Sequence, residues 1–141
     1  MASNVTNAPS ASKGWTLGLW TVQVLLALAF GMAGFMKSTA PLETLAANMA
    51  WVSNVPGGLV RFIGIAELLG AIGLILPAAT RILPILTPAA GGGLLVVMGL
   101  AAGYHALHAE YAGIVPNVVL GLLAGFVAWG RFRKAPIAPR N

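Results

Sequence analysis

Residues 57–77 read GGLVRFIGIAELLGAIGLILP, and this stretch decides the fold class. It is apolar apart from Arg61 and Glu67. At a rise of about 1.5 Å per residue, a helix of about 20 residues covers the roughly 30 Å of a bilayer's hydrocarbon core. The stretch therefore predicts a membrane-spanning helix.

Three further apolar stretches of similar length occupy residues 15–36, 83–108 and 113–132. The chain is 58% apolar and 8% charged, with a mean hydropathy of +0.87. This composition excludes a soluble globular domain and a disordered chain. The absence of cysteine excludes disulfides and thiolate metal sites. We therefore expect an all-α fold, an integral membrane four-helix bundle.

The predicted domain organisation is simple. One four-span domain covers residues 15–132, with a polar cytoplasmic tail at 1–14 and a basic cytoplasmic tail at 133–141. The segment between the first two spans carries Pro41 and Glu43, which suit the first turn of a helix. Apolar residues then recur at helical spacing, at Leu42, Leu45, Met49 and Val52. We expect a short interfacial helix that covers the space between the spans, with a plain connector as the alternative.

Basic residues indicate the orientation. Four spans put both tails and the turn at Arg81 on one side of the membrane. That side carries six basic residues, namely Lys13, Arg81, Arg131, Arg133, Lys134 and Arg140. The other side carries only Lys37 and Arg61. The positive-inside rule predicts that both termini are cytoplasmic. The net charge of +5 thus reports orientation, and we expect no nucleic-acid partner.

Five polar side chains predict a site. Glu67 lies inside a span, where a carboxylate faces the bundle interior or costs about 2.5–3.5 kcal/mol. Because alternate spans run in opposite directions, Lys37, Arg61, Glu67, His105 and Asn117 all fall at one depth in the outer half. We expect a shared cavity there, with Glu67 and His105 as catalytic acid–base residues. Lys37, Arg61 and Asn117 are the expected substrate-binding residues.

Each of these side chains also has a structural interpretation. Lys37 and Arg61 could extend to head groups, and Asn117 could bond a neighbouring helix. Glu67 could pair with either cation, and His105 could lie at the interface.

Two other patterns bear on packing and on metals. His105 and His108 lie one helical turn apart with Glu110 following, but nothing completes a closed metal shell, so we expect no metal site. Small residues at helical spacing predict close approach of helices, at Gly64, Gly70, Gly73, Gly99, Gly103, Gly121 and Gly125.

Several runs resemble the DoxX-like membrane proteins. They are GFMK at 34–37, RFIGIAELLGAIGLILP at 61–77, Arg81, the Leu86-Thr87-Pro88 run, His105 and Asn117. The resemblance covers roughly residues 15–131. It implies a small multi-pass protein of the bacterial inner membrane, linked to quinone redox chemistry as an accessory or oxidoreductase subunit.

The function remains open among three classes. A redox accessory would hold a quinone in the cavity and work with a soluble or membrane oxidoreductase, since no flavin or iron–sulfur motif is present. Alternatively, a cofactor-free isomerase, cyclase or hydrolase would act on a lipophilic small molecule through Glu67 and His105. The third class is a non-catalytic assembly scaffold or chaperone. The lipid bilayer is a partner in every case, and a homo-oligomer stays open.

Overall fold

Residues 10–141 are described by a computed structural model, and all regular structure in that range is helical. The long helices are α1 (Lys13–Thr39), α3 (Gly57–Thr80), α4 (Leu86–Leu107) and α5 (Tyr111–Trp129). One π-helical turn, η2 (Gly130–Lys134), continues α5. Helices α1, α3, α4 and the continuous α5–η2 helix are each long and apolar enough to span a bilayer. The predicted all-α membrane four-helix bundle is confirmed. Residues 1–9 of the predicted polar tail lie outside the described residues.

The turn between the second and third spans lies later in the chain than the predicted 78–82. Helix α3 continues through Pro77 to Thr80 and ends at Arg81, whose φ of 60° is left-handed. An internal proline lacks an N–H and its ring crowds the carbonyl four residues earlier. The helix nevertheless continues beyond Pro77, and the Arg81 N–H bonds to the Pro77 carbonyl at 2.9 Å. The apolar pattern alone could not show that the helix tolerates Pro77.

The predicted interfacial segment forms two short pieces instead of one helix. Helix α2 (Leu42–Asn48) is followed by a 3₁₀ turn, η1 (Ala50–Asn54), with an extended Met49 between them. Leu45 and Val52 are buried against Val60 of α3. This small apolar cluster attaches the segment to the start of α3.

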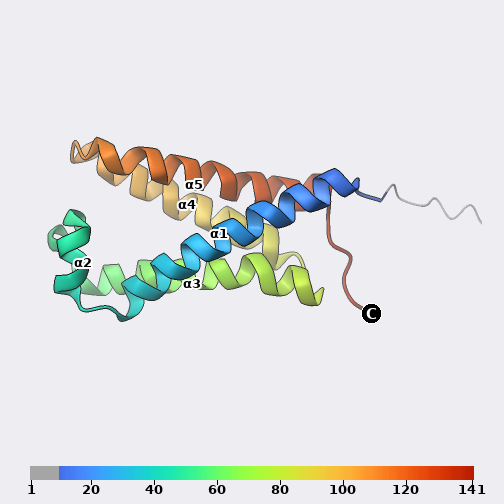
Figure 1. Ribbon diagram of the computed structural model, residues 1–141, viewed down its shortest axis with the longest axis horizontal. Coiled ribbons are helices and arrows are strands. Elements are labelled where there is room, and N and C mark those ends of the chain that lie inside the picture. Colours follow the sequence, from blue (N-terminus) through green and yellow to red (C-terminus); the bar gives the residue numbers. More distant parts are fainter. Residues whose placement is uncertain (1–9) are drawn as a thin grey trace, which may run out of the picture.

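The four spans pack as two antiparallel pairs. Helix α1 lies mainly on α3, α5 lies mainly on α4, and contacts between α3 and α4 join the pairs. Figure 1 shows α2 at one end of the molecule and the C-terminus at the other. We call these the cap end, which holds α2, η1 and the α4–α5 connection, and the tail end, which holds the start of α1, the α3–α4 connection and residues 135–141.

The core is a single column of apolar side chains along the middle of the bundle. Its largest members are Leu26, Phe30, Leu74, Leu94 and Met98. Side chains such as Leu17, Leu100 and Leu122 are instead about two-thirds exposed on the outer faces, at 71%, 71% and 67%. Apolar exposure on this scale fits a surface in contact with lipid.

The glycine predictions hold for most positions and fail for two. A Cβ added to Gly64 or Gly73 would lie 2.7 Å from a side-chain atom of the neighbouring helix, and one on Gly121 would lie 3.1 Å from Met98 Cβ. Gly99 and Gly103 have no such neighbour within 4 Å among the described residues. They are exposed on α4, so the prediction that they sit at a helix contact is wrong.

Candidate functional site

The site begins with the crossing of α1 and α3. A Cβ on Gly34 would lie 2.6 Å from the backbone nitrogen of Leu68 and 2.7 Å from the Gly64 carbonyl oxygen. A Cβ on Gly64 would lie 2.7 Å from Lys37 Cβ. The two backbones can approach this closely only because both positions are glycine.

This crossing brings Lys37 and Glu67 together. Side chains on a helix tilt toward its N-terminus, and α1 and α3 run in opposite directions. Lys37 therefore leans toward the middle of the bundle while Glu67 leans toward the cap end. Lys37 Nζ donates to Glu67 Oε1 at 2.8 Å and to Oε2 at 2.9 Å. The Glu67 residue is 1% exposed, and the Lys37 side chain is 13% exposed.

Arg61 has a different place from the one predicted for a substrate-binding residue. Its Nη1 donates to the backbone carbonyl of Lys37 at 2.9 Å, and its side chain is not among those that line the cavity described below. A guanidinium at the C-terminal end of α1 satisfies a free carbonyl and opposes the negative end of the helix dipole. Arg61 thus bonds to the backbone of Lys37 without lining the cavity.

The second helix pair supplies an imidazole and a carboxylate. His105 Nδ1 of α4 lies 2.7 Å from Oε2 of Glu110, in the connection to α5. Gly113 of α5 makes room for the ring, because a Cβ there would lie 2.7 Å from His105 Nδ1. Asn117 is one turn further along α5, and its amide Nδ2 donates to the Gly113 carbonyl at 2.7 Å.

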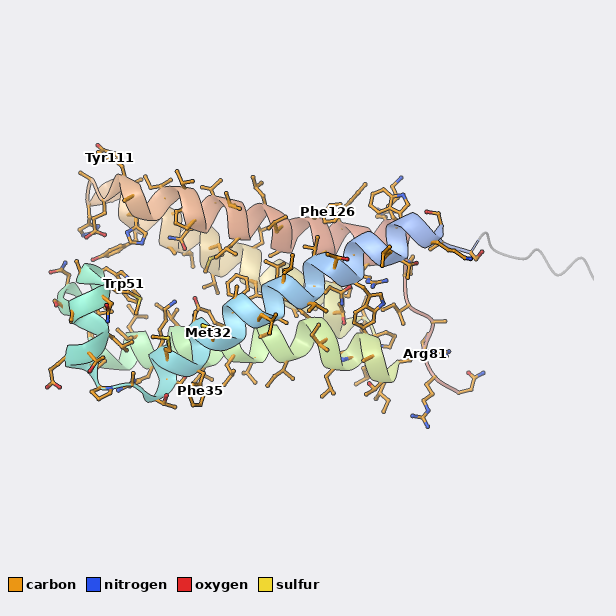
Figure 2. All side chains as sticks on the ribbon, in the orientation of Figure 1. Met32, Phe35, Trp51, Arg81, Tyr111 and Phe126 are labelled. Carbon is orange, nitrogen blue, oxygen red and sulfur yellow. The ribbon has the colours of Figure 1, made fainter. Side chains whose placement is uncertain are left out.

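Both helix pairs line one cavity of about 1030 Å³ at the cap end. Its wall is mostly apolar, with η1 and the end of α2 covering it. Figure 2 shows Trp51 of η1 and Tyr111 of α5 at this end of the molecule. The polar and charged side chains in the wall include Lys37, Glu67, Tyr104, His105, Glu110 and Asn117. The structure thus brings four of the five predicted site residues to one cavity.

Three contributors to the cavity were missed from sequence. The Tyr104 hydroxyl is buried and has no hydrogen-bond partner among the described residues. Glu110 orients His105, and the Trp51 ring centre lies 5.9 Å from Lys37 Nζ, within reach of a cation–π contact. Glu110 follows His105 by five residues at the end of a helix, and this spacing could have predicted their contact. Trp51 and Tyr104 carried no signal beyond aromatic character.

His108 lies apart from this group. Its Nδ1 bonds to the Tyr104 carbonyl at 2.8 Å, and its ring stacks on the Tyr104 ring with centroids 4.0 Å apart. Within residues 10–141 no three His, Cys, Asp or Glu side chains gather in a way that could hold a metal ion.

The model of the DoxX-like family matches residues 21–127. No curated protein and no solved structure matches the chain.

The crossing predicts the effect of adding one methyl group. Gly34→Ala should force α1 and α3 apart and lower the free energy of unfolding by about 1–3 kcal/mol, the usual cost of overpacking. Gly93→Ala is the matched control, because Gly93 is a lipid-facing residue of α4 with no neighbour within 4 Å among the described residues. The control should be neutral or slightly stabilising, by up to about 1 kcal/mol. Thermal unfolding in detergent measures both, and equal stability of the two variants would contradict the close crossing.

Proposed function

The chain belongs to the DoxX-like family, and we propose that its cavity binds a lipophilic molecule with a quinone-type head group. The observation that supports this is the cavity of about 1030 Å³, whose wall is mostly apolar. Its polar side chains form two groups, Lys37 with Glu67 on the α1–α3 side and Tyr104, His105, Glu110 and Asn117 on the α4–α5 side. Ligand pockets of a few hundred to about 1,000 Å³ with a few convergent polar groups are typical of small-molecule sites.

The polar groups suit a flat ring with two carbonyl oxygens. Lys37 has three N–H donors, and Glu67 accepts two of them. The third is left for a ligand oxygen on the α1–α3 side. On the α4 side, the Tyr104 hydroxyl is a buried donor without a partner among the described residues. The apolar wall would hold the isoprenoid-like part of the ligand.

Reduction of a quinone takes up two electrons and two protons. The proposal assigns the electrons to a soluble or membrane oxidoreductase partner, as in a redox accessory or subunit. The protons would pass through His105 and Glu110. An imidazole paired with a carboxylate at 2.7 Å can donate a proton to the ligand and take another from the carboxyl group. Glu67 then orients Lys37 in the wall through their two hydrogen bonds.

The His105–Glu110 pair also favours a second candidate. A cofactor-free isomerase, cyclase or hydrolase needs a positioned general acid–base, and this pair has that arrangement. Such an enzyme would convert a lipophilic carbonyl compound without any redox partner. Turnover by the purified chain alone would favour this candidate over the redox accessory.

Trp51 provides the test of binding, because it lies in the cavity wall while the other three tryptophans, Trp15, Trp20 and Trp129, lie nearer the tail end. In a variant with those three replaced by Phe, a short-chain ubiquinone should quench Trp51 fluorescence saturably. Adding Tyr104→Phe should leave stability unchanged and weaken binding by about two- to tenfold, the value of one net hydrogen bond.

A variant that retains only Trp129 is the control and should show linear, collisional quenching. Unsaturable quenching of Trp51 as well would contradict a quinone site. Saturable quenching that Tyr104→Phe leaves unchanged would remove the hydroxyl from the proposed contacts.

The proposal includes an orientation in a bacterial plasma membrane. Both chain ends leave the bundle at the tail end, where basic residues are in excess, so that end is assigned to the cytoplasm. A reporter fused after Asn141 should be active as a cytoplasmic enzyme and inactive as a periplasmic one. The reverse result would place the cavity in the cytoplasmic half.

A further inference from the structure

A second polar group is buried at the tail end, far from the cavity. Arg131 of η2 is only 4% exposed. Its Nε donates to Gln23 Oε1 at 2.6 Å and its Nη1 donates to the Ala135 carbonyl at 3.3 Å. Its Nη2 is buried and has no hydrogen-bond partner among the described residues. A guanidinium cannot lose its charge in a protein, so this group is a permanent buried cation.

The chain has no acidic side chain paired with this cation. It contains three acidic residues, Glu43, Glu67 and Glu110. Glu43 begins α2, Glu67 pairs with Lys37, and Glu110 pairs with His105, so all three lie at the cap end. The partners of Arg131 are a neutral amide, a carbonyl and the face of Trp20, whose ring centre is 5.3 Å from Cζ. A buried charge without an opposite charge is costly unless a ligand supplies one.

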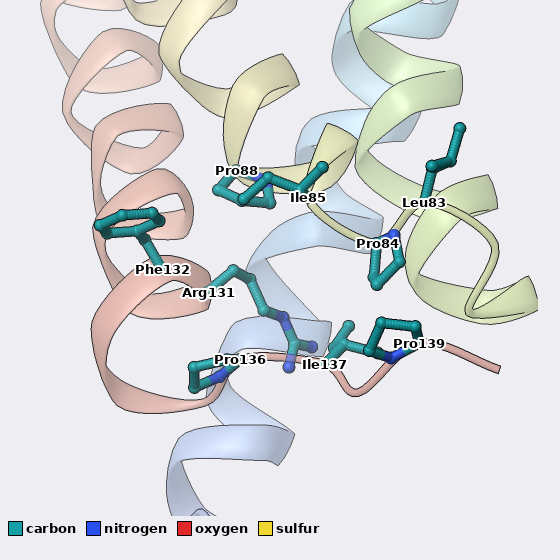
Figure 3. A pocket seen from close by; sticks show the side chains of 9 residues that line it. All are labelled: Leu83, Pro84, Ile85, Pro88, Arg131, Phe132, Pro136, Ile137 and Pro139. Atoms are coloured by element: carbon teal, nitrogen blue, oxygen red, sulfur yellow. The ribbon is translucent and has the colours of Figure 1, made fainter. Parts of the chain in front are cut away.

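A pocket of about 400 Å³ adjoins the guanidinium. Figure 3 shows Arg131 reaching from η2 toward Ile137 and Pro139 of the C-terminal segment, with Pro84 of the α3–α4 connection nearby. Arg131 is the only charged side chain among those that line this pocket in the described part of the chain, and the others are aliphatic, aromatic or proline. The pocket therefore combines one fixed positive charge with an apolar wall.

The C-terminal segment is held in place as part of this wall. Arg81 Nε donates to the Ala138 carbonyl at 3.0 Å, and Arg81 Nη2 donates to the Pro139 carbonyl at 3.2 Å. The Arg140 N–H returns a bond to the Arg81 carbonyl at 2.8 Å. These bonds connect residues far apart in sequence, so the pocket is formed by the fold and not by a single loop.

We propose that this pocket binds a phosphate group, with Nη2 of Arg131 as the buried donor. An arginine fork is the side chain best suited to phosphate oxygens. Arg131 lies in the last turn of the candidate span Tyr111–Lys134, and the end of a span is where lipid head groups are expected. The apolar wall suits the glycerol and upper acyl chain of a phospholipid. Five further basic residues surround this end and favour an anionic lipid, namely Lys13, Arg81, Arg133, Lys134 and Arg140.

The test compares lipid affinities of the full chain in detergent by native mass spectrometry. Phosphatidylglycerol and phosphatidylcholine share the phosphodiester, but the second has a cationic group beside it. Wild type should bind phosphatidylglycerol about tenfold more tightly or better. Arg131→Gln should lose this preference. Arg133→Gln, which removes one of the surrounding exposed charges but leaves the buried donor in place, should keep most of the preference.

A second arm distinguishes the source of the phosphate. Inorganic phosphate, added against chloride at equal ionic strength, should raise the unfolding temperature of wild type only if the pocket also takes free phosphate. Protection by inorganic phosphate without a lipid preference would assign the site to a soluble phosphate. No effect in either arm, or equal losses in Arg131→Gln and Arg133→Gln, would overturn the proposal.

Arg131→Gln could fail to fold, because Arg131 also bonds to Gln23 and Ala135. Ile137→Trp is the second variant. It fills the pocket from the C-terminal segment and leaves every hydrogen bond of Arg131 in place. It should lose the preference for phosphatidylglycerol while remaining folded. Wild-type lipid preference in Ile137→Trp would overturn the proposal even if Arg131→Gln cannot be purified.

Discussion

The close crossing of α1 and α3 at Gly34 and Gly64 is the contact on which the cavity depends. Lys37 and Glu67 lie one helical turn from these glycines, and they meet because side chains on antiparallel helices lean toward each other there. A wider crossing would leave a carboxylate and an ammonium separately desolvated. Within a bilayer that arrangement is far more costly than a bonded pair.

Charge is divided between the two ends of the bundle. The acidic side chains lie toward the cap end, where Glu67 pairs with Lys37 and Glu110 bonds to His105 in the cavity wall. The charged side chains of the tail end are all basic, and one of them, Arg131, is buried. This difference in charge underlies the two proposals, a neutral lipophilic ring at the cap end and a phosphate group at the tail end. Gln23, a buried polar residue of α1, connects Arg131 to the carbonyl of Leu74 on α3.

The sequence predicted the features that depend on length, hydropathy and direction. Four apolar stretches sufficed for the bundle, and alternating directions sufficed to place Lys37, Glu67, His105 and Asn117 at one depth. Features that depend on how helices cross were not predictable in this way. Arg61 shares that depth but bonds to the Lys37 backbone carbonyl and does not line the cavity. Gly99 and Gly103 repeat at helical spacing but face outward. From sequence, Arg131 is only one of six basic residues that indicate orientation, because only the fold brings Gln23 and Ala135 to it.

The most direct test separates what the Lys37–Glu67 pair does for binding from what it does for stability. Unfolding free energy and quinone affinity are measured for wild type, Glu67→Gln and Lys37→Met/Glu67→Leu. Glu67→Gln leaves the largely buried Lys37 ammonium without an opposite charge and should lower the free energy of unfolding by about 3–5 kcal/mol. The double variant should recover that stability, because apolar residues of similar size replace buried ion pairs at little cost, while quinone affinity falls about tenfold or more. A double variant that keeps full quinone affinity, or stays as unstable as Glu67→Gln, would contradict a pair maintained for the ligand.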